Sequence, residues 1–156
     1  MAAMARELKI SPIRNGTVID HIGSGRALEV LRIIGRSTIP PDSTISVAIH
    51  VRSAKIEWKD IVKVENLELS SREVDAIALI APTATISIIR DFTVRDKRPV
   101  TLPDRVVGVL KCPNPTCITN QREPIESAFD VLRRRPPQLR CVFCEQLVDE
   151  PGRHLG

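Results

Sequence analysis

Two periodicities of apolar residues open the chain and predict a strand followed by a helix. Residues 17–22 are rich in β-branched side chains and follow an Asn-Gly turn pair, which indicates a strand. In residues 24–35 the apolar side chains recur at every third or fourth position, as on one face of a helix. We expect Ser24 to cap this helix and Gly35 to end it.

Strict alternation between apolar and polar residues predicts two more strands. Residues 44–51 alternate, and we interpret one face of this strand as core: Ile45, Val47, Ile49 and Val51. In residues 58–65, Val62 and Val64 point one way, and three other side chains point the opposite way: Lys59, Ile61 and Lys63.

A second helix and a last strand complete this part of the chain. Ser70 and Glu73 form a capping-box pattern ahead of an apolar face that ends before Pro82. Residues 84–94 are predicted to form the last strand, with Ile86 and Ile88 on the core side and Thr85, Ser87 and Ile89 on the open side. Residues 96–103 contain two prolines, and we interpret them as a linker.

The predicted order is strand, helix, strand, strand, helix, strand. This order is typical of the α+β ferredoxin-like arrangement, in which two helices cover one face of an antiparallel sheet. The opposite face stays open for a ligand or a partner. On that face the pattern brings cations together with hydrogen-bonding groups, as a polyphosphate and a ribose require: Lys59, Lys63, Lys97, Asp20, His21, Thr85 and Ser87. Solvated surface lysines give the same pattern, and the sequence contains no phosphate-binding loop of the G-x-x-x-x-G-K-[ST] type.

All four cysteines lie in the last third of the chain as two close pairs, Cys112 with Cys117 and Cys141 with Cys144. Such pairs present four thiolates to one tetrahedral zinc ion at about 2.3 Å per Zn–S bond. A fully occupied site of this kind has no open position for water, so we expect one structural zinc per chain. Two disulfides are the alternative. They require an oxidising compartment, whereas no signal peptide is evident at the N-terminus.

Composition supports a chain of two small units, the second of which is stapled by metal. We expect the boundary to divide the 156 residues into 1–100 and 101–156, with the second unit mostly β and similar to a zinc ribbon. No stretch approaches the roughly 18 apolar residues of a membrane span, so we expect a soluble cytoplasmic protein without a membrane partner.

The competing hypothesis is a zinc-ribbon protein that binds nucleic acid, because residues 133–135 are three consecutive arginines close to the cysteines. Two observations argue against it. One Trp and no Tyr leave few side chains for base stacking, and the net charge of +4 is spread evenly along the chain. A free-standing enzyme is not supported, because no nucleophile and base are paired in the sequence.

Four segments carry a resemblance to a known family: residues 14–22, 59–66, 81–85 and 109–118. In collinear order they resemble the regulatory chain of aspartate carbamoyltransferase, and the likeness runs from about Leu8 to Leu147. The resemblance implies a non-catalytic subunit in pyrimidine biosynthesis. It also implies that the N-terminal domain binds the nucleoside triphosphates CTP and ATP, with UTP as a further candidate, and pairs with a second regulatory chain. The zinc domain is then expected to dock onto the catalytic chain.

Site roles follow from the same resemblance. Asp20 and Lys63 are expected to contact the ribose, and His21 and Lys97 the phosphates. The remaining positions surround the base, with backbone contacts from two of them and apolar lining from three: Ile13, Phe92, Val18, Ile89 and Val94. The zinc ligands are expected to be Cys112, Cys117, Cys141 and Cys144. The sequence departs from the family pattern where Ser87 and Thr116 replace asparagines, and where Pro12 removes a backbone donor beside the base.

Overall fold

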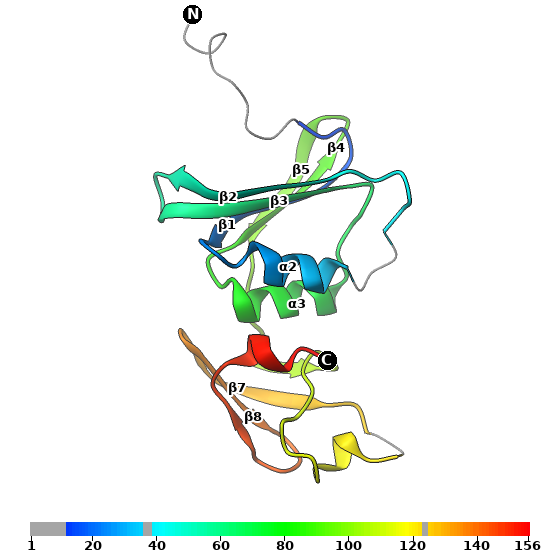
Figure 1. Ribbon diagram of the computed structural model, residues 1–156, viewed down its shortest axis with the longest axis vertical. Coiled ribbons are helices and arrows are strands. Elements are labelled where there is room, and N and C mark those ends of the chain that lie inside the picture. Colours follow the sequence, from blue (N-terminus) through cyan, green and yellow to red (C-terminus); the bar gives the residue numbers. More distant parts are fainter. Residues whose placement is uncertain (1–11, 36–38, 123–124) are drawn as a thin grey trace, which may run out of the picture.

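The computed structural model describes residues 12–35, 39–122 and 125–156 and shows two antiparallel sheets in this part of the chain (Figure 1). The larger sheet has the strand order β2-β3-β1-β4-β5, with β1 (Gly16–Gly23), β2 (Ile45–Ser53), β3 (Glu57–Glu65), β4 (Thr85–Arg90) and β5 (Thr93–Pro99). The smaller sheet has the order β6-β7-β8-β9, with β6 (Arg105–Val107), β7 (Ala128–Arg134), β8 (Pro137–Cys141) and β9 (Leu147–Val148).

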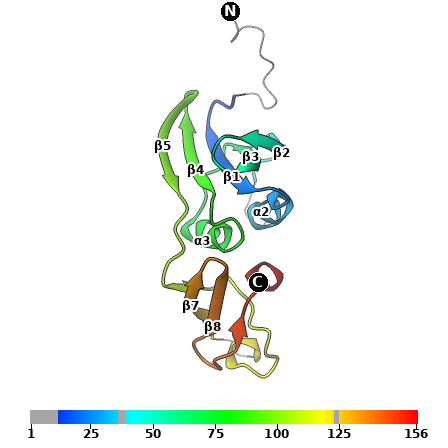
Figure 2. The same ribbon diagram turned by 90° about the vertical axis from the view of Figure 1, so that its left-hand side faces the viewer.

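Two α-helices of the described chain, α2 (Ala27–Ile34) and α3 (Ser71–Ile80), cover one face of the larger sheet. The order β1-α2-β2-β3-α3-β4 and the antiparallel pairing confirm the predicted α+β, ferredoxin-like arrangement. Both views place the helices between the larger sheet and the C-terminal half (Figure 2). The uncovered face of the sheet therefore points away from the C-terminal half.

A single core runs through both halves. Sheet residues such as Ile19 and Val62 and helix residues such as Val30 and Ile77 are fully buried against one another. The same cluster continues through the connecting segment and into the small sheet, by way of Val100, Leu102, Val106, Phe129 and Leu139. Two short 3-10 helices, η1 (Ile118–Asn120) and η2 (Pro151–His154), complete the C-terminal half.

The predicted start of the second helix is confirmed. The Ser70 hydroxyl accepts a hydrogen bond from the Glu73 N–H, and the Glu73 carboxylate accepts one from the Ser70 N–H, which is a complete capping box.

The predicted cap of the first helix is wrong. Ser24 is exposed and lies beside the His50 ring, whereas the N–H groups at the start of α2 donate to a carboxylate from another strand. Asp60 of β3 is fully buried and accepts hydrogen bonds from Gly25 N–H at 2.9 Å and Ala27 N–H at 3.0 Å. It also accepts one from the His50 N–H of β2 at 2.9 Å. A sequence pattern cannot identify a cap that arrives from 33 residues away.

The prediction that one face of β2 forms core is also wrong. β2 is the edge strand of the larger sheet, and Ile45, Val47 and Ile49 have exposed fractions of 39%, 37% and 51%. The β3 partners of Ile45 and Val47, which are Val64 and Val62, are fully buried, because β3 packs against α2 and lies between two other strands.

The single strand predicted for residues 84–94 is in fact a hairpin. Asp91 and Phe92 both have positive φ angles, 51° and 62°, which form a tight turn of the kind that joins twisted strands. The turn is held by the Arg14 carbonyl and the Asn15 side chain, which accept the N–H groups of Phe92 and Asp91. The first part of the predicted linker, residues 96–99, consequently belongs to β5.

No helix in the described part of the chain is long and apolar enough to cross a membrane.

We expect the Asp60→Ala variant to lose roughly 2–4 kcal/mol of unfolding free energy, because it leaves three backbone N–H groups, one buried and two part-buried, without their acceptor. Urea unfolding monitored by circular dichroism measures the loss. Asp42→Ala is the matched control, because Asp42 is exposed in a turn. Equal stability of the two variants would contradict this role of Asp60.

Candidate functional site

The four cysteines converge on one point in the C-terminal half. Their Sγ atoms all lie within 4.8 Å of one another, with 3.5 Å between Cys112 and Cys144 and 3.7 Å between Cys117 and Cys141. A tetrahedral ion with bonds of about 2.3 Å requires neighbouring sulfurs to be about 3.8 Å apart. The cluster therefore fits one tetrahedral metal ion, and none of these cysteines forms a disulfide.

Local hydrogen bonds hold the two cysteine-bearing loops in shape. The Asn120 side chain donates to the carbonyl oxygens of Cys112, at 2.9 Å, and of Asn114, at 2.8 Å. In the second loop, between β8 and β9, the Cys141 N–H donates to the Gln146 carbonyl at 2.9 Å. These contacts fix the loops from outside the cluster, as supporting groups do in structural metal sites.

The thiols of the cluster have shifted acidities. Burial raises the pKa of Cys112 and of Cys141, so a cation is needed to hold these sulfurs as thiolates at neutral pH. Burial also acts on Cys144, but hydrogen bonds from Asn114 and from the Gln146 backbone outweigh it and lower the pKa of that thiol to about 7. Cys144, the least buried of the four, is therefore the readiest to ionise.

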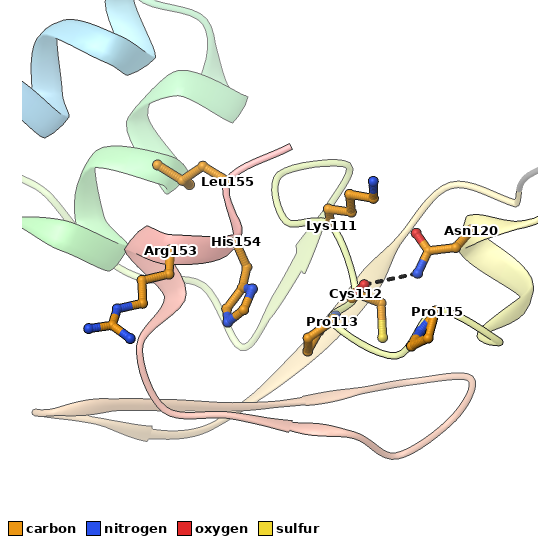
Figure 3. Close-up of a pocket in the computed structure, with 8 residues that line it drawn as sticks. All are labelled: Lys111, Cys112, Pro113, Pro115, Asn120, Arg153, His154 and Leu155. Carbon is orange, nitrogen blue, oxygen red and sulfur yellow. Dashed lines mark hydrogen bonds between the residues drawn. The ribbon is translucent and has the colours of Figure 1, made fainter.

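A pocket of about 460 Å³ opens beside the cluster, between the Cys112 loop and η2 (Figure 3). Its lining includes three basic residues, Lys111, Arg153 and His154, and the Cys112 loop contributes Pro113 and Pro115. The Lys111 N–H donates to the His154 carbonyl at 2.6 Å, which ties η2 to the metal loop. The surface next to the metal cluster is thus concave and basic.

The arginine run of β7 and the following turn is used within the chain itself. Arg133 donates to the Pro136 carbonyl, Arg134 to Leu102 O and Asp104, and Arg135 to the Pro82 carbonyl. Three of these contacts reach other segments: two go to the segment that connects β5 with β6, and one goes to Pro82, just after α3. The run therefore serves as a structural contact, which weakens the nucleic-acid hypothesis.

The open face of the larger sheet aligns the predicted effector residues in one row. In the strand register Lys63 of β3 pairs with Val18 of β1, Val18 pairs with Ser87 of β4, and Ser87 pairs with Lys97 of β5. Residues paired in this way project from the same side of a sheet. The sheet thereby gathers side chains that are up to 79 residues apart in sequence, since Val18 and Lys97 belong to one row.

Asp20 and His21 lie one step along the sheet from this row. The Asp20 carboxylate is 3.0 Å from Lys59 Nζ, and it accepts the His21 N–H at 2.6 Å. The His21 ring lies at a β-bulge, with a φ of 56°, and its Nδ1 is 3.2 Å from the Thr85 hydroxyl. Bulges commonly redirect a side chain at a functional site.

The electrostatics of this region favour an anion. Burial lowers the pKa of His21; the Asp20 charge opposes this, and three ammonium groups add to it: Lys59, Lys55 and Lys97. Burial likewise lowers the pKa of Lys63, against the attraction of Asp20. Several cationic groups therefore act on one small area with a single nearby carboxylate, which is an arrangement that an anionic ligand stabilises.

The expected base-binding residues lie at the opposite end of the open face. Ile13 and Ile89 are buried, whereas Phe92 and Val94 are exposed by 67% and 53%. Ile89 pairs with Val94 across the β4–β5 hairpin, and the Phe92 N–H is taken by the Arg14 carbonyl. The structure thus places these four residues around the β4–β5 turn.

Two residues near His21 were not predicted from the sequence as part of the site. Thr83 donates to the His21 carbonyl at 2.8 Å, and Lys55, in the turn between β2 and β3, acts on the His21 charge. Lys55 lies outside every periodic segment, so no pattern identifies it. For Lys59 the signal was present, because it shares a strand face with Lys63.

Comparisons with known proteins cover nearly the whole chain. Residues 8–101 match the family model described as aspartate carbamoyltransferase regulatory chain, allosteric domain. Residues 104–152 match the model described as aspartate carbamoyltransferase regulatory chain, metal binding domain.

Curated relatives agree with these matches. The chain is 53% identical over 145 residues to an aspartate carbamoyltransferase regulatory chain from Methanothrix thermoacetophila, which covers 93% of this chain and 94% of the relative. It is 52% identical over 145 residues to the one from Halobacterium salinarum, covering 93% and 92%. The one from Thermoplasma volcanium is 49% identical over 146 residues, covering 93% and 95%.

Replacing Lys59 with Met is expected to raise the pKa of His21, because one of the ammonium charges that lower it is removed and Asp20 loses its ion-pair partner. Asp20→Asn should lower the pKa of His21 further. Histidine Cε1–H signals followed by NMR between pH 5 and 8 measure both shifts. His50 and His154 serve as internal controls. A His21 pKa that is unchanged by both substitutions would show that the His21, Lys59 and Asp20 side chains do not interact.

Proposed function

This chain belongs to the family of aspartate carbamoyltransferase regulatory chains, and on that premise we propose that its open sheet face binds nucleotide effectors while its metal centre fastens it to the catalytic chain. As a regulatory chain it is a non-catalytic subunit. The observation that supports the effector site most is the single row of Lys63, Val18, Ser87 and Lys97 beside His21. We further propose that residues 1–100 form the effector-binding domain and residues 101–156 the docking domain.

The proposed effectors are CTP and ATP, with UTP as a third candidate. Asp20 and Lys63 bind the ribose, and His21 and Lys97 bind the phosphates. The base lies toward the β4–β5 turn, against Ile13, Phe92 and the apolar residues Val18, Ile89 and Val94. In the unliganded chain Lys59 forms an ion pair with the Asp20 carboxylate. When the ribose binds Asp20 in place of Lys59, the Lys59 ammonium group becomes available to a phosphate.

Zinc is the metal that we propose for the four-cysteine cluster. Four thiolates in a tetrahedral arrangement suit Zn²⁺ and leave no position open for a reacting water, so the ion stabilises the fold. Free cysteines of this kind are typical of a reducing compartment, which supports a cytoplasmic location.

The basic pocket beside this cluster supports the docking of the catalytic chain. Lys111, on the loop whose shape the metal would fix, and Arg153 and His154, on η2, offer donors to an acidic segment of that partner. Loss of the ion would therefore remove both the fold of the loop and the surface it presents.

The edge strand β2 supports pairing with a second regulatory chain. It exposes Ile45, Val47 and Ile49, and no other strand of the described residues pairs with its outer edge. A monomer would carry such an edge at the risk of aggregation, whereas a homodimer that pairs β2 with its copy covers it.

Coupling between effector and active site requires that each effector prefer one quaternary state, by about 1–3 kcal/mol. The layered arrangement gives the route. The effector face, the sheet, the helices and the metal half follow one another in space, so a change at the open face reaches the catalytic chain through α2 and α3.

Replacing Lys97 with Ala should weaken CTP binding about tenfold, because one phosphate contact is lost, which corresponds to about 1.4 kcal/mol. Equilibrium titration of the assembled complex with CTP measures this. Arg98→Ala is the matched control, because Arg98 is the next residue and projects from the opposite face of β5. The phosphate role of Lys97 would be rejected if both variants bound CTP like the unsubstituted chain, or if both lost affinity equally.

Treating the assembled complex with a mercurial should release one zinc ion per regulatory chain and separate regulatory from catalytic chains. The reason is that a structural zinc site contributes roughly 10–16 kcal/mol to folding at neutral pH. Released zinc is quantified with a coloured chelator, and assembly is followed by gel filtration. Reagent quenched beforehand with excess thiol is the control. A complex that survives complete zinc release would disprove the docking role.

A further inference from the structure

A pocket of about 420 Å³ lies on the flank of the larger sheet, between α3 and the edge strand β5. It is on the helix-covered side, because its sheet residues pair as Ile86 with Arg98 and Ile88 with Asp96, in alternation with Ser87 and Lys97. Its apolar wall belongs to the core or packs against it: Leu69, Val74, Ile86, Ile88 and Val100. The pocket is thus separate from the nucleotide face and backed by rigid structure.

The charges around this pocket do not cancel. Arg98 is neutralised by Asp96, whose Oδ2 accepts from Arg98 Nε at 3.0 Å and from Nη2 at 2.5 Å. Asp75 of α3 also lines the pocket and is half-buried, but in the described part of the chain its carboxylate has no hydrogen-bond or ion-pair partner. Burial raises the pKa of Asp75, with no opposing contribution from a cation. One uncompensated negative charge therefore remains at the pocket.

An unpaired carboxylate beside an apolar wall defines what the pocket can accept. Removing water from the carboxylate is costly unless a cation takes the place of that water. An apolar group is favoured against Val74 and Ile88, and the volume falls in the range of small-molecule sites, which are mostly apolar with a few polar groups that fix orientation. An anion meets repulsion from Asp75, and a neutral molecule of the same shape gains only the apolar contact.

We propose that this pocket is a binding site for a small organic cation with an apolar body, of the class of protonated arylalkylamines. The ammonium group pairs with Asp75, and the aromatic body lies against the wall formed by α3, β4 and β5. The site does not depend on nucleotide binding, although β4 and β5 carry Ser87 and Lys97 on their other face.

The test uses the full-length, metal-loaded chain with 13C-labelled methyl groups, because every apolar wall residue carries a methyl probe. Titration with 2-phenylethylamine at pH 7 should shift the signals of Val74, Ile88 and Val100 in a saturable manner. 2-Phenylethanol, the neutral isostere, should bind at least tenfold more weakly. Equal affinities for the two molecules, or no saturable shift at millimolar amine, would overturn the proposal.

Two variants assign the charge. Asp75→Asn should reduce amine affinity to that of the alcohol and leave alcohol binding unchanged, whereas Asp42→Asn removes an equal charge elsewhere and should have no effect. Methyl signals distant from the pocket report that each variant is folded. An excess of CTP should leave amine binding intact; displacement of the amine by CTP would place it on the nucleotide face and reject the site. An identical loss in both variants would reject the role of Asp75.

Discussion

The packing of α2 and α3 against one face of the five-stranded sheet is the constraint on which the other features depend. The helices use both of their sides. On one side, fully buried side chains such as Val30 and Ile77 face the sheet. On the other side, Ile80 and Glu29 lie so close to Gly152 of η2 that an added Cβ would be within 3.2 Å of both side chains. An ion pair between Arg72 of α3 and Glu126 adds a second link to the C-terminal half. The molecule is therefore layered, with the open sheet face at one end and the cysteine cluster in the opposite half.

The C-terminal half has a small hydrophobic core and a cluster of four cysteines suited to a metal ion. Its large fully buried side chains are Phe129, Leu139 and Val106, while Leu132 and Phe143 are about half exposed. A sheet of two- to seven-residue strands gains little from such a core, so the proposed metal ion would be the main source of its order. Because this core is small, hydrogen bonds from the Arg134 and Arg135 side chains to the carbonyl groups of Leu102 and Pro82 add contacts outside the sheet.

Local patterns predicted what depends on neighbouring residues, and failed where distant segments decide. The capping box at Ser70 and the cysteine pairs are local, and the structure confirms both the box and the clustering. The β4–β5 turn was missed because Asp91 and Phe92 contain no glycine to indicate positive φ. The exposure of β2 could not be predicted from the sequence. Alternation shows that a strand has two different faces, but it does not show whether a helix covers one of them.

The candidate effector site shows the same division. Sequence reasoning and family resemblance selected Lys63, Val18 and Lys97, and the strand register aligns them in one row. The Asp20–Lys59 ion pair and the nearness of Lys55 to His21 depend on a bulge and a turn, whose geometry no periodicity encodes.

The buried Asp60 carboxylate links segments that are far apart in the sequence. The carboxylate accepts hydrogen bonds from the N–H groups of Gly25, Ala27 and His50, and so it joins the start of α2 to both strands of the β2–β3 hairpin. Lys59, the preceding residue of β3, projects to the open face and forms an ion pair with Asp20. Adjacent residues of β3 therefore contact the open face and the start of α2, and Glu29 of that helix lies beside Gly152 of η2, so a short series of contacts joins the ion pair of the open face to the C-terminal half.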